Sequence, residues 1–120
     1  MAKLLVVEDD DLNREMLSRR LQLEGYQVIA ADNGATAIKL ARSERPDLIL
    51  MDMGLPLLNG FQATARLKAQ PETARIPIIA LTAFSGSADR AECLAAGCDE
   101  YETKPIAFVQ LFSKIEALLG

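Results

Sequence analysis

The sequence predicts an α/β fold in which one parallel sheet of five strands is connected by five helices. Short apolar runs of strand length alternate along the chain with segments of helical period, the pattern of repeated strand–helix units. Three of the apolar runs are continuous, as expected for strands that are covered on both faces. The chain has 120 residues, 50% of them hydrophobic, which is enough for one core, so we expect a single domain over residues 1–120.

The predicted strands are the five short apolar runs. They lie near residues 3–7, 27–31, 47–51, 76–81 and 98–102. The first, third and fourth are the continuous runs, so we expect these three at the centre of the sheet.

Each predicted strand is followed by a predicted helix. The helices lie near residues 11–24, 34–44, 60–69, 87–96 and 107–119. The first carries Leu12, Met16 and Leu23 on one side, with Leu17 and Leu21 beside them. The last has the clearest apolar stripe at i, i+3, i+4 and i+7, which is typical of a helix docked on a core. Its stripe consists of Phe108, Leu111, Phe112, Ile115, Leu118 and Leu119.

Composition excludes several functions. The net charge of −4 and the pI of about 4.8 argue against a protein that binds nucleic acid, because such a protein needs a basic face. No signal peptide is recognisable, and no apolar run approaches the roughly 18 residues of a membrane span. We therefore expect a cytoplasmic protein that does not contact nucleic acid or membrane directly.

The chain contains no histidine, which excludes Ser-His and Cys-His catalysis and a phosphohistidine on the chain itself. Its two cysteines, Cys93 and Cys98, are too few soft ligands for a four-ligand zinc site. We interpret them as small, partly buried residues.

Acidic residues follow two of the continuous strands. Glu8 and Asp9 come directly after the first strand, and Asp52 comes after the third. In open parallel sheets, ligands bind beyond the carboxyl ends of the strands where the strand order reverses. If the order is 2-1-3-4-5, these three carboxylates converge within a few ångströms. Their repulsion is relieved by a cation, and Mg²⁺ suits such oxygen ligands. Asp10 or Asp11 is instead interpreted as the cap of the following helix.

Two further strand ends carry polar groups that fit chemistry on Asp52. Thr82 follows the fourth strand, where its hydroxyl can donate to a phosphoryl oxygen. Lys104 follows the fifth strand, where its ammonium can balance the acids and then bind the phosphoryl group. This set favours Asp52 as the nucleophile that accepts a phosphoryl group with the help of Mg²⁺.

In order and spacing, the whole chain resembles the CheY-like receiver domain of bacterial response regulators, whose fold is flavodoxin-like and doubly wound. The segments that carry the resemblance are residues 5–10, residues 47–53, Leu55-Pro56, Asn59-Gly60, Leu81-Thr82-Ala83 and Lys104-Pro105. It is most similar to stand-alone regulators and to receivers fused to hybrid kinases. The end of the sequence at Gly120 favours a regulator without an output domain.

The resemblance implies a role for each matching position. Asp52 would accept a phosphoryl group from a phosphohistidine on a sensor histidine kinase or a histidine phosphotransfer protein. Asp9 would ligate Mg²⁺ directly, Glu8 would do so through water or in part, and the backbone carbonyl of Gly54 would supply a further ligand. Thr82 and Lys104 would bind the phosphoryl oxygens.

The resemblance also implies a switch and a regulated lifetime. The Lys104–Pro105 bond is commonly cis in this family. Phosphorylation would draw Thr82 toward the new oxygens and let Tyr101 move inward, which reshapes a protein-binding face formed by the fourth helix, fifth strand and fifth helix. Glu8 departs from the aspartate often found at its position, a replacement that leaves metal binding intact in this family. Gly54 and Phe84 occupy positions that tune autodephosphorylation, with a sign that the residues leave open.

Two alternatives are weighed against a signalling phosphoacceptor that catalyses only its own phosphorylation and dephosphorylation. A haloacid dehalogenase-like phosphatase also uses a strand-end aspartate with Mg²⁺, but it would leave Asp52 unexplained. A receiver fold kept only as an interaction scaffold would not need the acidic residues together with Thr82 and Lys104.

Overall fold

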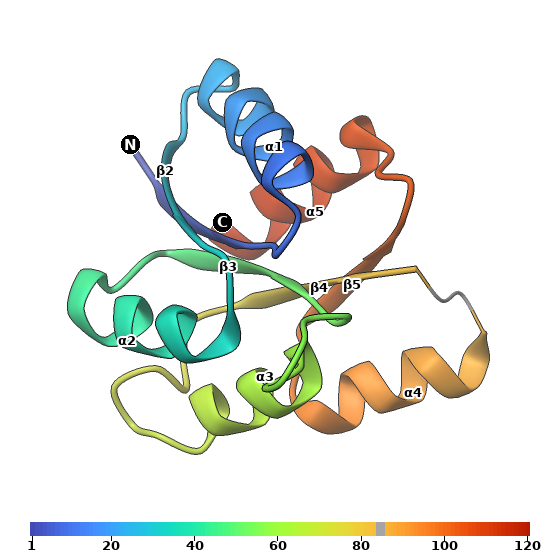
Figure 1. Cartoon of the computed structure of the whole chain (residues 1–120). Helices are drawn as coiled ribbons and strands as arrows, with labels where there is room; N and C mark the ends of the chain where they lie inside the picture. The colour runs from blue at the N-terminus through green and yellow to red at the C-terminus, as the bar shows by residue number, and fades with distance from the viewer. Residues whose placement is uncertain (84–85) are drawn as a thin grey trace.

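The computed structural model describes residues 1–83 and 86–120, and in this part of the chain five strands form one parallel sheet (Figure 1). The strands are β1 (Lys3–Val7), β2 (Gln27–Ala31), β3 (Leu48–Asp52), β4 (Ile78–Thr82) and β5 (Glu100–Thr103). Their order is β2-β1-β3-β4-β5, and all neighbouring pairs are parallel. The predicted order and the central place of the first, third and fourth strands are confirmed.

Helices cover both faces of the sheet. They are α1 (Asp11–Leu23), α2 (Gly34–Glu44), α3 (Gly60–Lys68), α4 (Ser87–Ala96) and α5 (Phe108–Leu119). Figure 1 shows α1 and α5 on one face and α2, α3 and α4 on the other. All five lie within one residue of the predicted bounds. Of the two residues predicted to cap α1, Asp10 is the cap, and its carboxylate accepts a hydrogen bond of 2.8 Å from the Asn13 N–H.

Three strands differ from the prediction by one or two residues. Pro77 has no N–H to donate, and the fourth strand starts only at Ile78. The third strand extends one residue further than predicted. Asp52 is still paired with Leu81 of β4, so it is the last residue of β3 rather than the first residue after it. Thr82 likewise ends β4, and the fifth strand begins two residues later than predicted.

The core consists of two apolar layers that share the central strands. On β1, Leu5 and Val7 belong to the layer under α2, α3 and α4, whereas Leu4 and Val6 belong to the layer under α1 and α5. Because residues of a strand alternate between its faces, each continuous apolar run supplies both layers. Burial on both sides holds the central strands rigidly, and with them the residues at their carboxyl ends.

Helix α1 uses only part of its apolar surface for this packing. Leu17 and Leu21 are buried, whereas Leu12 and Leu23 are 78% and 77% exposed and Met16 is 54% exposed. The apolar residues of α1 form two adjacent rows, and a helix lying on a sheet presents only one row to it. The row of Leu12, Met16 and Leu23 therefore faces outward.

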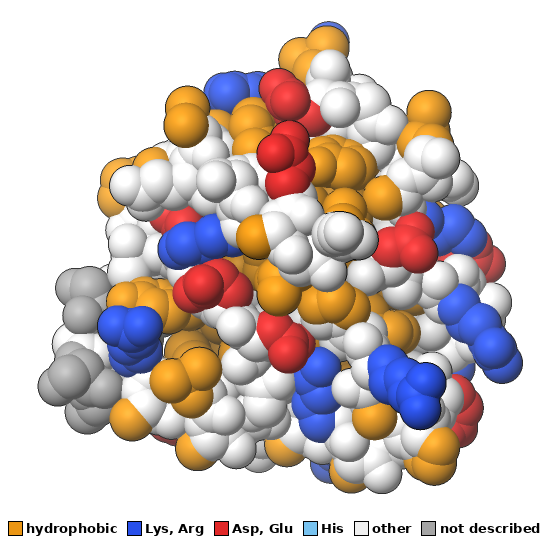
Figure 2. All heavy atoms as spheres, turned by 180° about the vertical axis from the view of Figure 1, so that it is seen from behind, with side chains coloured by type: hydrophobic (Ala, Val, Ile, Leu, Met, Phe, Trp, Pro, Cys, Tyr) orange, Lys and Arg blue, Asp and Glu red, His pale blue; other side chains and the backbone are white. Residues whose placement is uncertain are grey.

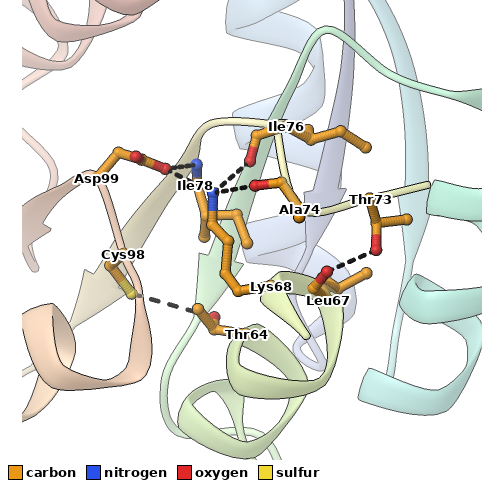
Figure 3. Close-up of polar contacts among 9 residues, drawn as sticks. All are labelled: Thr64, Leu67, Lys68, Thr73, Ala74, Ile76, Ile78, Cys98 and Asp99. Atoms are coloured by element: carbon orange, nitrogen blue, oxygen red, sulfur yellow. Dashed lines mark hydrogen bonds and ion pairs between the residues drawn. The ribbon is translucent and has the colours of Figure 1, made fainter. Parts of the chain in front are cut away.

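At the amino end of β4 and β5, one lysine ties three segments together (Figure 3). Lys68 Nζ, at the end of α3, donates to the carbonyls of Ala74 and Ile76, at 3.3 and 2.8 Å, and to Asp99 Oδ2 at 3.0 Å. Asp99 also accepts from the Ile78 N–H at 2.8 Å. These contacts fix the start of the two strands whose other ends carry Thr82 and Lys104.

The surface mixes charges of both signs. Figure 2 shows lysines and arginines interleaved with aspartates and glutamates on the face seen from behind. Among the described helices, none combines the length and apolar character required to cross a bilayer.

Candidate functional site

The carboxyl ends of the central strands bring three acidic side chains together. Glu8 and Asp9 follow β1 and Asp52 ends the neighbouring β3, and one carboxylate oxygen from each lies within 4.8 Å of the others. Glu8 and Asp52 are buried, at 3% and 5% exposed, whereas Asp9 is exposed. The acids predicted to lie at the carboxyl ends of neighbouring strands thus form one cluster.

Lys104 lies between the two buried acids. Its Nζ atom is 3.0 Å from Glu8 Oε1 and 3.3 Å from Asp52 Oδ1. Burial lowers the pKa of Lys104, but the hydrogen bond to Glu8 and the charge of Asp52 outweigh burial and leave this pKa above its ordinary value. The ammonium is therefore fully charged near neutral pH and neutralises part of the acidic cluster.

The electrostatics of Glu8 differ from those of an exposed carboxylate. Burial, followed by the close approach of Asp52, raises the pKa of Glu8, and Lys104 offsets only part of this effect. Two partly desolvated carboxylates close together thus retain an unfavourable interaction that one ammonium does not remove.

Several contacts that hold the acids were not predicted from the sequence. The Gly54 N–H donates to Asp52 Oδ1 at 3.0 Å, and the Asp10 N–H donates to Glu8 Oε2 at 3.3 Å. Arg14, in the first turns of α1, donates to the backbone carbonyl of Glu8 at 3.0 Å. For Arg14 the only sequence signal is its i, i+3 spacing from Asp11, with which it also pairs at 2.6 Å.

The start of α3 packs directly behind Asp52. Asn59 and Gln62 form a capping box, in which each side chain accepts a hydrogen bond from the other residue's N–H, at 2.9 and 3.0 Å. A Cβ atom on Gly60 would overlap the carbonyl oxygen of Asp52 and lie 2.6 Å from Met53 Cα. Only glycine allows this approach, which explains the Asn59-Gly60 pair noted in the sequence.

Thr82 and Tyr101 occupy the two strands beyond β3. Thr82 is 2% exposed at the end of β4, and its carbonyl accepts from the Lys104 N–H at 2.8 Å, which links the loop after β5 to β4. Tyr101 on β5 is half-buried and packs against the core layer under α4. The Lys104–Pro105 peptide bond is cis. Phe84 lies outside the described residues.

Comparison with known families agrees with this arrangement. Residues 4–116 match the model of the response regulator receiver domain. The chain belongs to the response regulator receiver family.

Two relatives have nearly the same length as this receiver. The polar-differentiation response regulator DivK of Brucella anthropi is 39% identical over 117 residues, which cover 98% of this chain and 95% of DivK. Protein PilH of Pseudomonas aeruginosa is 40% identical over 120 residues, covering 100% of this chain and 99% of PilH.

A solved structure with the same fold contains a metal. The receiver domain of a sensor histidine kinase from Pseudomonas aeruginosa superimposes with a TM-score of 0.92 and is 38% identical, covering 99% of this chain and 98% of that chain. It has a magnesium ion coordinated in its active-site cleft.

The acidic cluster of this receiver fits the same kind of ion. One carboxylate oxygen each of Glu8, Asp9 and Asp52 lies within 4.8 Å of the others, so the three groups could hold one metal ion together. The ligand atoms are hard carboxylate oxygens, and the exposed Asp9 leaves the cluster open to water.

Proposed function

We propose that Asp52 accepts a phosphoryl group from a phosphohistidine on a sensor histidine kinase or a histidine phosphotransfer protein. The observation that carries the proposal is the position of Asp52: it is buried at the strand end, clustered with two other acids and 3.3 Å from the Lys104 ammonium. The resemblance to DivK, PilH and the magnesium-containing receiver supports the same assignment. We propose that residues 1–120 form one receiver unit and act in the cytoplasm.

Glu8, Asp9, Asp52 and the backbone carbonyl of Gly54 would hold Mg²⁺. The bound ion supplies positive charge that neutralises phosphoryl oxygens in the transition state. A metal ion bound there would relieve the repulsion that remains between Glu8 and Asp52, because Lys104 alone does not balance the three carboxylates.

The transfer itself needs a nucleophile and groups that receive negative charge. A carboxylate oxygen of Asp52 forms a bond to phosphorus, the phosphorus–nitrogen bond of the phosphohistidine breaks, and the imidazole keeps the electron pair. Lys104 exchanges its contacts with Glu8 and Asp52 for the arriving phosphoryl oxygens. The Thr82 hydroxyl, at the end of the neighbouring strand, donates to another of these oxygens.

A groove next to the site offers the donor a place to approach. It has a volume of about 470 Å³ and is bounded by Glu8 and Lys104 at the site and by α1 and the start of α5 further out. Its other lining residues are Asn13, Met16, Leu17, Pro105, Ile106 and Phe108. Because the groove is continuous with the acidic cluster, a helical partner seated in it would bring its phosphohistidine to Asp52.

We propose that phosphorylation is transmitted through Thr82 and Tyr101 to the face formed by α4, β5 and α5, where a downstream protein binds. The chain would catalyse only its own phosphorylation and dephosphorylation. In this role it is a signalling protein, as its relatives are.

The test is incubation with Mg²⁺ and acetyl phosphate or phosphoramidate, followed by intact mass measurement. We expect a gain of one phosphoryl group that is lost in Asp52→Asn and in EDTA. Asp47→Asn is a matched control, because Asp47 is an exposed aspartate just before the same strand. Labelling of Asp52→Asn as in the parent would refute Asp52 as the acceptor.

The same labelling experiment, together with an assay of phosphate release from small phosphoesters, separates the alternatives. Continuous release of phosphate from small phosphoesters, without a single stoichiometric label, would indicate a haloacid dehalogenase-like phosphatase. Absence of any label with Mg²⁺ present would indicate a scaffold without phosphotransfer.

A further inference from the structure

Glu102 is a buried acid that the proposed phosphorylation does not use. It lies on β5 beside Leu81 of β4 and is 3% exposed. Its carboxylate is paired with Lys114 of α5, whose Nζ is 2.8 Å from Glu102 Oε1. A buried carboxylate needs such a partner, so Glu102 fixes where the Lys114 ammonium lies.

The same ammonium reaches the backbone of Tyr101 at the edge of the sheet. β5 is an edge strand, so half of its backbone groups have no neighbouring strand. The Tyr101 N–H donates to Glu100 Oε1 at 3.0 Å, and the Tyr101 carbonyl accepts from Lys114 Nζ at 2.7 Å. Lys114 therefore extends from α5 around the edge of β5.

The Tyr101 ring lies near cations from two helices. Lys114 Nζ is 5.4 Å from the ring centroid, and the Arg90 guanidinium of α4 is 5.2 Å from it. Both distances are within the range of attractive cation–π contacts. Helices α4 and α5 are thus both connected to one half-buried aromatic ring.

We propose that the Glu102–Lys114 ion pair positions Tyr101 and so sets how readily its ring moves when Asp52 is phosphorylated. This inference rests on the proposed function. Lys114 is held by Glu102 and cannot follow the ring, so an inward movement of Tyr101 loses the contact with Lys114. The pair thereby favours the ring position seen in this structure, and phosphorylation must overcome that preference.

A purely structural role would give Lys114 the task of covering the exposed edge of β5. In that case its loss would lower stability but would leave the ring of Tyr101 in the same place. The position of the ring therefore distinguishes the two roles.

The chain has no tryptophan and two tyrosines, so a Tyr26→Phe background leaves Tyr101 as the only source of tyrosine signals. In this background we would record the Tyr101 ring resonances by NMR, with and without phosphorylation by acetyl phosphate and Mg²⁺. Lys114→Met keeps the aliphatic stem and removes the ammonium. Lys114→Arg keeps the charge, and Lys39→Met is a control at an exposed lysine of α2.

In unphosphorylated Lys114→Met, we expect the Tyr101 resonances to shift toward those of the phosphorylated parent. The shift should correspond to a roughly fivefold or larger change in the population ratio of the two ring positions. Lys114→Arg should restore the parent ratio, and Lys39→Met should leave it unchanged. Tyr101 signals of Lys114→Met that match the parent in both states would overturn the inference.

Two further measurements keep the result interpretable. If Lys114→Met alone fails to fold, Glu102→Leu with Lys114→Met removes the buried charge together with its partner, and the same shift of Tyr101 is expected. Intact mass is recorded on every sample. A parent that gains no phosphoryl group overturns the proposed function and this inference together, whereas a labelled parent with no Lys114-dependent shift overturns the inference alone.

Discussion

Lys104 Nζ lies 3.0 Å from Glu8 Oε1, although the two residues are 96 positions apart in the chain. The contact joins the loop after an edge strand to the loop after a central strand, across the end of the sheet. Because the same ammonium also lies 3.3 Å from Asp52, a single cation holds two buried carboxylates in place. The site is therefore stabilised by a group that, in the proposed transfer, would release these contacts to bind the phosphoryl group.

Replacing Lys104 by methionine should make stability depend strongly on Mg²⁺. Without the ammonium, Glu8 and Asp52 repel each other at close range, and we expect a loss of about 1–3 kcal/mol in the free energy of unfolding in EDTA, less than for a fully buried pair because Lys104 is partly exposed. Added Mg²⁺ should restore most of it. Urea unfolding with EDTA and with Mg²⁺ measures both values. Equal stability of the variant in the two buffers would contradict the prediction.

The raised pKa of Glu8 predicts a pH dependence in the absence of metal. A carboxyl whose pKa is higher in the folded state than its ordinary 4.5 binds its proton more tightly when folded, so its contribution to stability is lost as pH rises above 4.5. Glu8→Gln cannot ionise. In EDTA we expect the free energy of unfolding of Glu8→Gln to equal that of the parent near pH 4.5 and to exceed it at neutral pH.

Urea unfolding of both proteins across this pH range, in EDTA, provides the measurement. Mg²⁺ should reverse the order at neutral pH, because the parent gains a ligand that the amide replaces poorly. If the parent instead becomes more stable than Glu8→Gln as pH rises in EDTA, ionised Glu8 stabilises the fold and the prediction is wrong.

The fold was predictable because each central strand is a continuous apolar run, and a parallel sheet follows from runs that alternate with helical segments. The cluster of Glu8, Asp9 and Asp52 was predictable for a related reason: topology alone brings the ends of β1 and β3 together. The contacts of Arg14 and of the Gly54 N–H depend on the exact path of short loops, which residue pattern does not specify.

Burial was harder to predict than topology. Two apolar rows on α1 are equivalent in the sequence, and only the packing on the sheet selects the row that contains Leu17 and Leu21. Glu102 is the opposite case, since a charged residue in an edge strand is expected to be exposed. Its burial requires Lys114, which lies on a helix that the sequence does not connect to this strand position.

Cys98 should react slowly with alkylating reagents in the folded protein. Burial, followed by the neighbouring Cys93, raises the pKa of Cys98 from 9.0 to about 11, and the thiolate is the reactive form. At a pH well below both values, this lowers the thiolate fraction about hundredfold relative to the unfolded chain. Iodoacetamide labelling followed by peptide mass measurement, with and without urea, gives the two rates. Equal rates would contradict the prediction.

Gly60→Ala should damage both stability and phosphorylation. The new Cβ would meet the backbone of Asp52 and Met53, and neither can move as a flexible side chain would, so α3 or the end of β3 must shift. We expect a loss of about 1–3 kcal/mol in the free energy of unfolding, the usual cost of overpacking. Because the shift displaces Asp52, labelling by acetyl phosphate should also slow.

Gly54→Ala is the matched comparison for stability, since a Cβ there comes no closer than 3.6 Å to Asp52 Oδ1, an ordinary contact distance. Its free energy of unfolding should stay within about 0.5 kcal/mol of the parent. Both variants are measured by urea unfolding in EDTA, which separates the backbone clash from any effect on metal binding. A Gly60→Ala variant as stable as Gly54→Ala would mean that the start of α3 moves freely relative to Asp52, and the close packing behind the carboxylate would then not hold it in position.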